Sequence, residues 1–183
     1  MNIDVKLKRK DGRNVMGQIK ILDESYIEKI MNLQEEINRG LTYKEWYSST
    51  SKEEFYIQLT KNGKIVGCVL NDDSLIAIGV YVEWGYEEDN YGYDLKINKE
   101  YLLKVGQIEA TLVHEMYRGN NLQKTICTEL EKIALLRKNK LIAVTVHPEN
   151  IYSLKTFYDL GYKVRLEKLK YGGLRRYILA KNI

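Results

Sequence analysis

Residues 113–125 read VHEMYRGNNLQKT, and this stretch decides how the chain folds. An apolar run ends here, a turn-forming Arg-Gly-Asn-Asn sequence follows, and an amphipathic run begins directly after it. Gly119 lets the main chain approach a ligand closely, and Asn121 is one of the few non-glycine residues that tolerate a left-handed backbone. We therefore predict a strand that passes through a tight turn straight into a helix.

A helix start of this kind is a candidate anion-binding site. The first backbone N–H groups of a helix have no acceptor within it, and the helix dipole adds partial positive charge, so a phosphate can bind with few specific side chains. Arg118 and Lys124 add full charges nearby. The alternative is an ordinary strand-to-helix turn. A nucleotide P-loop is disfavoured because the Gly-Lys-Ser/Thr ending is missing, and a Rossmann motif because its second and third glycines are absent.

The segments on either side of this turn predict a βαβ unit. Residues 105–113 (VGQIEATLV) are typical of a strand, residues 121–140 of an amphipathic helix, and the continuously apolar residues 141–146 (LIAVTV) of a buried parallel strand. The fold class is therefore α/β.

Further upstream, the pattern predicts two helices and then a hairpin. A helix is expected from about residue 23 to Gly40, and a shorter one begins after Ser51 as its N-cap. The apolar runs at residues 64–70 and 75–84, joined by Asn-Asp-Asp-Ser, indicate an antiparallel pair of strands.

The two ends of the chain add further strands and a helix. Alternating residues 2–8 and 15–22 flank an Asp-Gly turn signal and indicate an opening hairpin. A last helix is expected at residues 151–160, followed by strands at residues 162–170 and 174–181. No linker or repeat divides this order, so residues 1–183 are expected to form one domain.

Composition excludes several classes of protein. With 44% hydrophobic and 30% charged residues in 183, the chain is typical of a soluble globular domain. A net charge of +4 is too mild for a nucleic-acid binder, and no window is apolar enough for a membrane span. The basic start does not resemble a secretory signal, so we expect a cytoplasmic protein. Cys68 and Cys127 lie far apart, which favours buried free thiols over a metal site.

Two segments resemble motifs of the GNAT acetyltransferase superfamily. Residues 113–123 resemble the pyrophosphate-binding motif, usually written Gln/Arg-x-x-Gly-x-Gly/Ala, and residues 147–163 resemble a later motif. The later motif is represented by Asn150, Ser153, Phe157, Gly161 and Tyr162. The resemblance extends from about residue 19 to the end. It implies a GNAT fold, with a mixed central sheet of about six or seven strands, about four flanking helices and an extra N-terminal hairpin.

The resemblance also implies a cosubstrate, acetyl-CoA, and no metal. The amides of residues 118–124 would hold the CoA pyrophosphate, the preceding strand near Leu112 would pair with the pantetheine arm, and Asn150 would contact that arm. The chain departs from the family pattern at Asn121 and Gln123, where Gly and Gly or Ala are commoner. The implied CoA-binding residues are Leu112, Val113, Arg118, Gly119, Asn120, Asn121, Leu122, Gln123, Lys124 and Asn150.

Acetyl transfer to an amine needs a group that accepts a proton, and we nominate Glu109. It stands on the strand that would run beside the thioester, directly before the motif. The alternative is a solvated Glu on the outer face of an amphipathic strand. His114 and His147 have no visible partner in the sequence, and loop or capping roles are the simpler interpretation.

The proton donor to the leaving thiolate is less clear from the sequence. The tyrosine that many GNAT enzymes place near the sulfur falls on Phe157, which has no proton to give. Tyr158 is one residue further, about 100° around a helix, and is our nominee. Tyr152 is an alternative, as is departure of the thiolate without a side-chain acid.

The acceptor is expected to be a small-molecule or peptide amine. An acidic and aromatic loop at residues 85–98 is a candidate mouth for a cationic amine, although a solvated loop is the alternative. A CoA-binding sensor with reduced catalysis is the second functional hypothesis, and a nucleic-acid-binding domain a weaker third. No nucleic-acid or membrane partner is expected, and monomer and homodimer both stay open. The loop residues concerned are Tyr86, Glu87, Glu88, Asp89, Tyr91, Tyr93 and Asp94.

Overall fold

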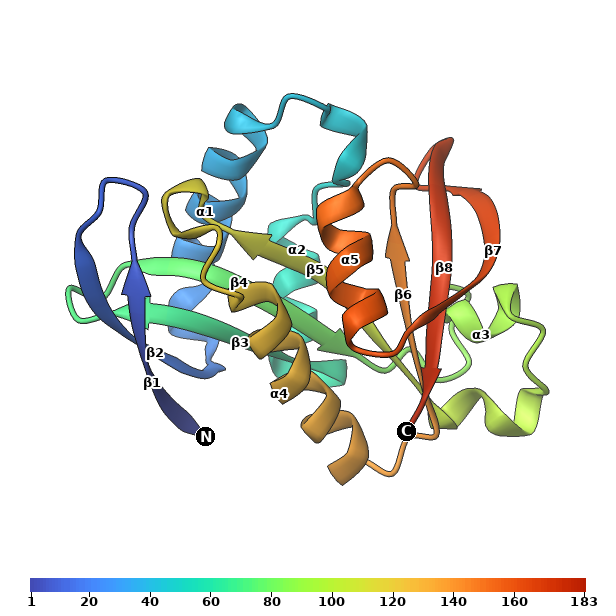
Figure 1. The fold of residues 1–183 in the computed structure, drawn as a ribbon. Helices are drawn as coiled ribbons and strands as arrows, with labels where there is room; N and C mark the ends of the chain where they lie inside the picture. Colours follow the sequence, from blue (N-terminus) through green and yellow to red (C-terminus); the bar gives the residue numbers. More distant parts are fainter.

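The computed structural model describes residues 1–183 and is built on one eight-stranded sheet. The strands lie in the order β1-β2-β3-β4-β5-β6-β8-β7, and only β5 and β6 are parallel neighbours (Figure 1). This confirms the predicted mixed sheet and N-terminal hairpin. The strands are β1 (Asn2–Lys8), β2 (Asn14–Leu22), β3 (Gly63–Leu70), β4 (Leu75–Val82), β5 (Val105–Val113), β6 (Leu141–Val146), β7 (Lys163–Lys170) and β8 (Leu174–Asn182).

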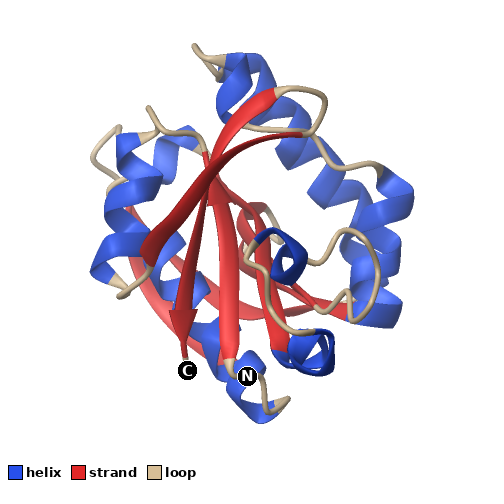
Figure 2. Ribbon diagram, turned by 90° about the vertical axis from the view of Figure 1, so that its right-hand side faces the viewer, coloured by secondary structure: helices blue, strands red, loops and turns tan.

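Helices cover both faces of the sheet (Figure 2). On one face, α1 (Ile27–Gly40) and α2 (Lys52–Ile57) bury Ile30, Leu33 and Phe55 in one apolar cluster. On the other, α4 (Leu122–Leu136) and α5 (Ile151–Asp159) share a second cluster with the strands. The Ser51 side chain accepts a hydrogen bond from the amide of Glu54, which confirms the predicted cap of α2.

The segment expected to be a loop at residues 85–98 contains a short helix. In α3 (Tyr91–Asp94), Tyr91 is buried against Ala143 of β6 and Ile178 of β8. The Asn90 side chain caps this helix by accepting from the amide of Gly92. Because the segment is polar, its sequence did not predict this helix, which covers one end of the sheet.

Strand β5 carries a β-bulge in its middle. Gly79 of β4 pairs with Thr111 and Tyr81 pairs with Ile108, so Glu109 and Ala110 together stand opposite a single residue of β4. Ile108 packs in the cluster beneath α4, whereas Ala110 packs in the cluster beneath α1 and α2. In a regular strand these two side chains would lie on one face of the sheet. The bulge therefore reverses the faces to which the side chains of the second half of β5 point.

Strands β5 and β6 pair over only part of their length. Val105–Ile108 pair with Leu141–Val144, and beyond Ile108 the two strands continue without pairing. The divergence is visible in Figure 1. The edge of β5 that faces β6 is therefore open from Glu109 to Val113.

Three further features follow from the structure. Cys68 and Cys127 are buried free thiols, as predicted. No three His, Cys, Asp or Glu side chains gather as a metal ion would require. None of the helices is long and apolar enough to cross a membrane.

Candidate active site

A cavity of about 400 Å³ opens at the residues where β5 and β6 separate. Its walls come from the segment that joins α1 to α2, from α2 itself, from the segment after β4, and from β5, β6 and the β7–β8 hairpin. Elements that are distant in sequence therefore meet at Glu109, one of the lining residues.

The Glu109 carboxylate is held by three side-chain donors. Trp84 Nε1–H donates to Oε1 at 2.6 Å, Gln58 Nε2 donates to Oε2 at 2.8 Å, and Gln107 Nε2 donates to Oε1 at 3.2 Å. The solvated outer-face alternative does not describe this residue. Neither Gln58 nor Trp84 carried a signal in the sequence, because both reach Glu109 from other elements.

The environment of Glu109 suits a group that exchanges a proton near neutral pH. Burial raises its pKa, the hydrogen bond from Trp84 opposes that rise, and the charge of Glu54 adds to it, so that the pKa is about 7. A general base works best when its pKa lies close to the working pH. Both the fixed position of the carboxylate and its raised pKa therefore suit a proton acceptor.

Tyrosine hydroxyls line the side of the cavity formed by β6 and the β7–β8 hairpin. Tyr171 bonds through its hydroxyl to Thr145 Oγ1 at 2.9 Å and to the hydroxyl of Tyr91. Burial raises the pKa of both tyrosines, so both stay neutral at physiological pH. Tyr171 carried no functional signal in the sequence, because it lies in a Tyr-Gly-Gly run that is typical of a hairpin turn.

The turn before α4 has the backbone geometry expected from its sequence. Gly119 has φ +90° and Asn121 has φ +57°, both in the left-handed region. The first amide of the helix with a backbone acceptor is that of Thr125, which donates to the Asn121 carbonyl at 2.9 Å. The amides of residues 119–124 have no acceptor in the protein. Leu122 is buried and anchors the helix start to the core.

The N-terminal hairpin supports this turn through Asn120. The amide of Lys8 donates to Asn120 Oδ1 at 2.9 Å, and Asn120 Nδ2 donates to the Lys8 carbonyl at 2.9 Å. The same Nδ2 also donates to the carbonyl of Tyr117 at 2.9 Å. The side chain of Asn120 thus holds the turn to β1, a role that the sequence did not indicate.

Two further residues implied to bind CoA also have their side chains engaged within the protein. Gln123 Nε2 donates to Thr111 Oγ1 at 2.9 Å and to Ser153 Oγ at 3.1 Å, and so links α4 to β5 and α5. Asn150 caps α5 by accepting from the amide of Ser153 at 3.2 Å. Leu112 is buried and pairs with β4 rather than β6, as does its neighbour Val113.

The charged residues of the turn remain at the surface. Lys124 lies 3.8 Å from a carboxylate oxygen of Asp159, and both side chains are largely exposed. Arg118 is exposed as well. Ion pairs of this kind contribute little to stability, so these two cations are available to an anion at the turn.

The structure does not bring Glu109 and Tyr158 into one cavity. Phe157 is buried edge-on against Tyr162, with ring centroids 5.2 Å apart. Tyr158 is 49% exposed on α5 and does not line the cavity. Its role as proton donor stays a prediction.

The acidic loop contributes less to the cavity than expected. Asp89 and Tyr91 line it, but the other loop residues do not. Asp94 is paired with Lys168 and Lys170, so its charge is neutralised within the protein. The loop residues that stay outside the cavity are Tyr86, Glu87, Glu88, Tyr93 and Asp94.

Both histidines act as local caps, as the sequence analysis suggested. His114 Nδ1 accepts from the amide of Met116 at 3.1 Å, and His147 Nδ1 accepts from the amide of Glu149 at 3.2 Å. His114 also contacts Glu36 through Nε2 at 2.9 Å, a partner that the sequence did not reveal. Neither histidine lines the cavity.

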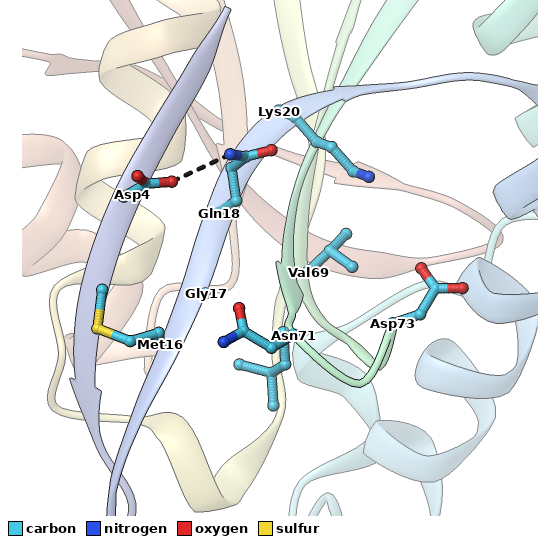
Figure 3. Close-up of a pocket in the computed structure, with 9 residues that line it drawn as sticks. Asp4, Met16, Gly17, Gln18, Lys20, Val69, Asn71 and Asp73 are labelled. Atoms are coloured by element: carbon cyan, nitrogen blue, oxygen red, sulfur yellow. Dashed lines mark hydrogen bonds between the residues drawn. The ribbon is translucent and has the colours of Figure 1, made fainter.

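A second hollow, of about 460 Å³, lies over β1, β2 and β3 (Figure 3). It shares no residue with the Glu109 cavity. Its carboxylates are engaged, since Asp4 accepts from Gln18 at 3.0 Å and Asp73 pairs with Lys29.

One family model matches most of the sequence. A model described as the acetyltransferase (GNAT) family matches residues 20–162. Among curated proteins, none is significantly similar in sequence to this chain.

Solved structures share the fold at low sequence identity. An acetyltransferase of the GNAT family from Streptococcus pneumoniae has a TM-score of 0.70 at 15% identity, over 91% of this chain and 99% of that one. The GNAT domain of PAT from S. lividans has a TM-score of 0.65 at 14% identity, over 98% and 97%. The PaiA N-acetyltransferase of Thermoplasma acidophilum, solved in complex with coenzyme A, has a TM-score of 0.66 at 18% identity, over 91% and 99%.

Proposed function

Because this chain belongs to the GNAT family of acetyltransferases, we propose that it transfers an acetyl group from acetyl-CoA to the primary amine of an acceptor bound in the Glu109 cavity. One observation carries this proposal. Glu109, with a pKa of about 7, lies at the residue where β5 parts from β6. Glu109 could therefore accept a proton from an amine bound beside the unpaired edge of β5.

The turn before α4 supplies the features that a diphosphate needs. The unpaired amides of residues 119–124 and the dipole of α4 favour an anion, and Arg118 and Lys124 add charge. The open edge of β5 at Glu109–Val113 offers main-chain groups to the amide-containing pantetheine arm, much as a strand would pair. These residues fit acetyl-CoA, which supplies the acetyl thioester when bound.

The chain's own residues contribute a proton acceptor and a shaped cavity. The acceptor amine nitrogen forms the new C–N bond as the C–S bond of the thioester breaks. The nitrogen loses a proton to the carboxylate of Glu109, which Gln58 and Trp84 hold in place. The thiolate leaves and takes a proton from Tyr158 or from water. Alignment of the two reactants can lower the barrier by as much as about 7 to 11 kcal/mol, so a modest base suffices.

Calorimetry with acetyl-CoA and a thiol-release assay test this proposal. We expect saturable binding of acetyl-CoA and release of free thiol that depends on an added primary amine. A protein that neither binds acetyl-CoA nor melts at a higher temperature in its presence would contradict the proposal outright.

A CoA-binding sensor is the second candidate. The observation in its favour is the position of Phe157 in the core and of Tyr158 outside the cavity, which leaves α5 without a hydroxyl among the cavity-lining residues. A sensor would be stabilised by acetyl-CoA but would release no thiol with any amine tested. The same two measurements therefore separate the candidates.

A further inference from the structure

One buried guanidinium in the cavity wall forms no ion pair within the protein. Arg176 of β8 is 3% exposed, and its guanidinium makes a single hydrogen bond, from Nη1 to the carbonyl oxygen of Arg175 at 2.7 Å. The partly buried Arg9 and Arg137 each pair with a carboxylate. No carboxylate lies within ion-pairing distance of Arg176. Burial lowers its pKa, and the more distant Glu45 carboxylate and the tyrosines Tyr171 and Tyr91 oppose this fall only in part. A buried cation without a directly paired counter-ion is costly, so an anion from outside the protein would stabilise it.

The other basic residue of the cavity, unlike Arg176, is paired with a carboxylate. Lys170 lines the same cavity, but its Nζ lies 2.6 Å from Asp94 and its charge is satisfied. The ring of Tyr171 lies 5.5 Å from the guanidinium carbon of Arg176. Trp46 also lines the cavity, and its indole N–H is buried without an acceptor. In this cavity the Trp46 indole N–H therefore has no acceptor, and the Arg176 guanidinium has only the Arg175 carbonyl oxygen.

The cavity has an acidic side and a basic side. The charges of Glu54 and Asp89 raise the pKa of Glu109, so the three carboxyl groups lie near one another. Arg176 lies on β8, and β6 separates this strand from β5. Two regular strand spacings of about 4.8 Å would separate β5 from β8, and β5 and β6 diverge beyond Ile108, so the backbones of Glu109 and Arg176 are more than about 10 Å apart. A ligand that spans this gap would meet carboxylates at one end and a guanidinium at the other.

We propose that the acceptor is a small amino carboxylate, whose amine lies at Glu109 and whose carboxylate is bound by Arg176. This inference rests on the proposed acetyl transfer. A guanidinium offers parallel N–H groups that match the two oxygens of a carboxylate. The acceptor's ammonium is attracted by Glu54 and Asp89. It gives one proton to solvent, and the neutral amine then loses a second proton to Glu109 as the amide forms. The cavity of about 400 Å³ is large enough for a molecule of this size.

Matched pairs of acceptors test the inference. The panel contains the L-α-amino acids and the ω-amino acids of three to six carbons, each beside its carboxamide, which keeps the amine and the size but removes the negative charge. We expect kcat/KM for the preferred carboxylate to exceed that for its carboxamide by roughly 100-fold. The same carboxylate should raise the melting temperature of the protein when acetyl-CoA is present.

Two variants show whether Arg176 causes the preference. Arg176→Met should lose roughly 100-fold in kcat/KM for the carboxylate, mainly through KM, and change little for the carboxamide. Arg175→Met is the control, since Arg175 is exposed and pairs with Glu167 outside the cavity. Without ligands, Arg176→Met should melt at or above the temperature of the unmodified protein, because it removes an unpaired buried charge.

Several outcomes overturn the inference. Equal use of carboxylates and carboxamides overturns it, as does an equal loss on both in Arg176→Met. The inference is also overturned if the protein binds acetyl-CoA but no member of the panel reacts with it or stabilises it. Failure to bind acetyl-CoA is a different result, because it removes the proposed acetyl transfer itself. An aminophosphonate preferred over every carboxylate would replace the carboxylate assignment with a phosphonate one.

Discussion

The turn before α4 and the Glu109 cavity, the two proposed ligand sites, present different kinds of chemical group. At the turn, the groups on offer are backbone amides, set by the left-handed conformations of Gly119 and Asn121. In the cavity, they are side chains such as Glu109 and Arg176 that converge from separate strands. A main-chain site tolerates many side-chain changes but not a change of backbone conformation, whereas a side-chain site can be disabled by one substitution.

The sharpest test of this comparison is Glu109→Gln. The amide keeps the shape of the side chain but cannot accept the amine proton at neutral pH, so kcat should fall by about 10²- to 10⁴-fold. Affinity for acetyl-CoA should not change, because the turn is untouched. Steady-state kinetics and calorimetry measure the two effects separately.

The matched control is Glu87→Gln, since Glu87 is an exposed carboxylate of the neighbouring loop and does not line the cavity. Its activity should stay within about twofold of the unmodified protein, as is usual for surface changes. If both variants lose activity equally, Glu109 has no specific role.

The pH dependence of stability is the next largest effect. The folded-state pKa of Glu109 is raised from 4.5 to about 7, so the folded protein binds this proton more tightly than the unfolded chain. Protonated Glu109 therefore adds up to about 3 kcal/mol to the free energy of unfolding. This stabilisation is fully present below about pH 4.5 and is lost as the pH rises to about 7. Denaturant unfolding between pH 5 and 8 should show this decline in the unmodified protein and a flatter profile in Glu109→Gln. Identical slopes would contradict the assigned pKa.

At the turn, the backbone should matter more than the side chain. Asn121→Val places a β-branched residue at φ +57°, which should cost about 1 to 2 kcal/mol and weaken acetyl-CoA binding by about tenfold. Asn121→Gly should bind acetyl-CoA as well as the unmodified protein, since glycine adopts this conformation freely. Calorimetry on both variants decides the point. Weak binding by Asn121→Gly would show that the side chain itself is needed.

The smallest expected effect belongs to Tyr158→Phe. Because Tyr158 does not line the Glu109 cavity and is half exposed, we expect kcat to fall by less than about fivefold, below the usual contribution of a general acid. Tyr101→Phe, also exposed and outside the cavity, serves as the matched control. A loss of 100-fold or more in Tyr158→Phe alone would make this tyrosine the proton donor and bring α5 into the reaction.

Much of the fold could be predicted from the sequence because its signals are local. The alternation in residues 105–113, the caps at Ser51 and Gly161 and the turn at Asn121 each depend on a few neighbouring residues. The short α3 was missed, because four residues of helix in a polar segment give no periodic pattern. The eighth strand is accounted for by the N-terminal hairpin that the sequence did indicate.

The sequence by itself determined the order of the elements, the βαβ unit and the main-chain turn, whose amides are left without acceptors. Only the tertiary structure decided which side chains share the cavity. The bulge that turns Glu109 toward Trp84 and Gln58 arises from the register between β4 and β5, and Arg176 joins them because β8 inserts between β6 and β7. Register and strand order depend on packing between segments far apart in the chain, and no local run of residues encodes them.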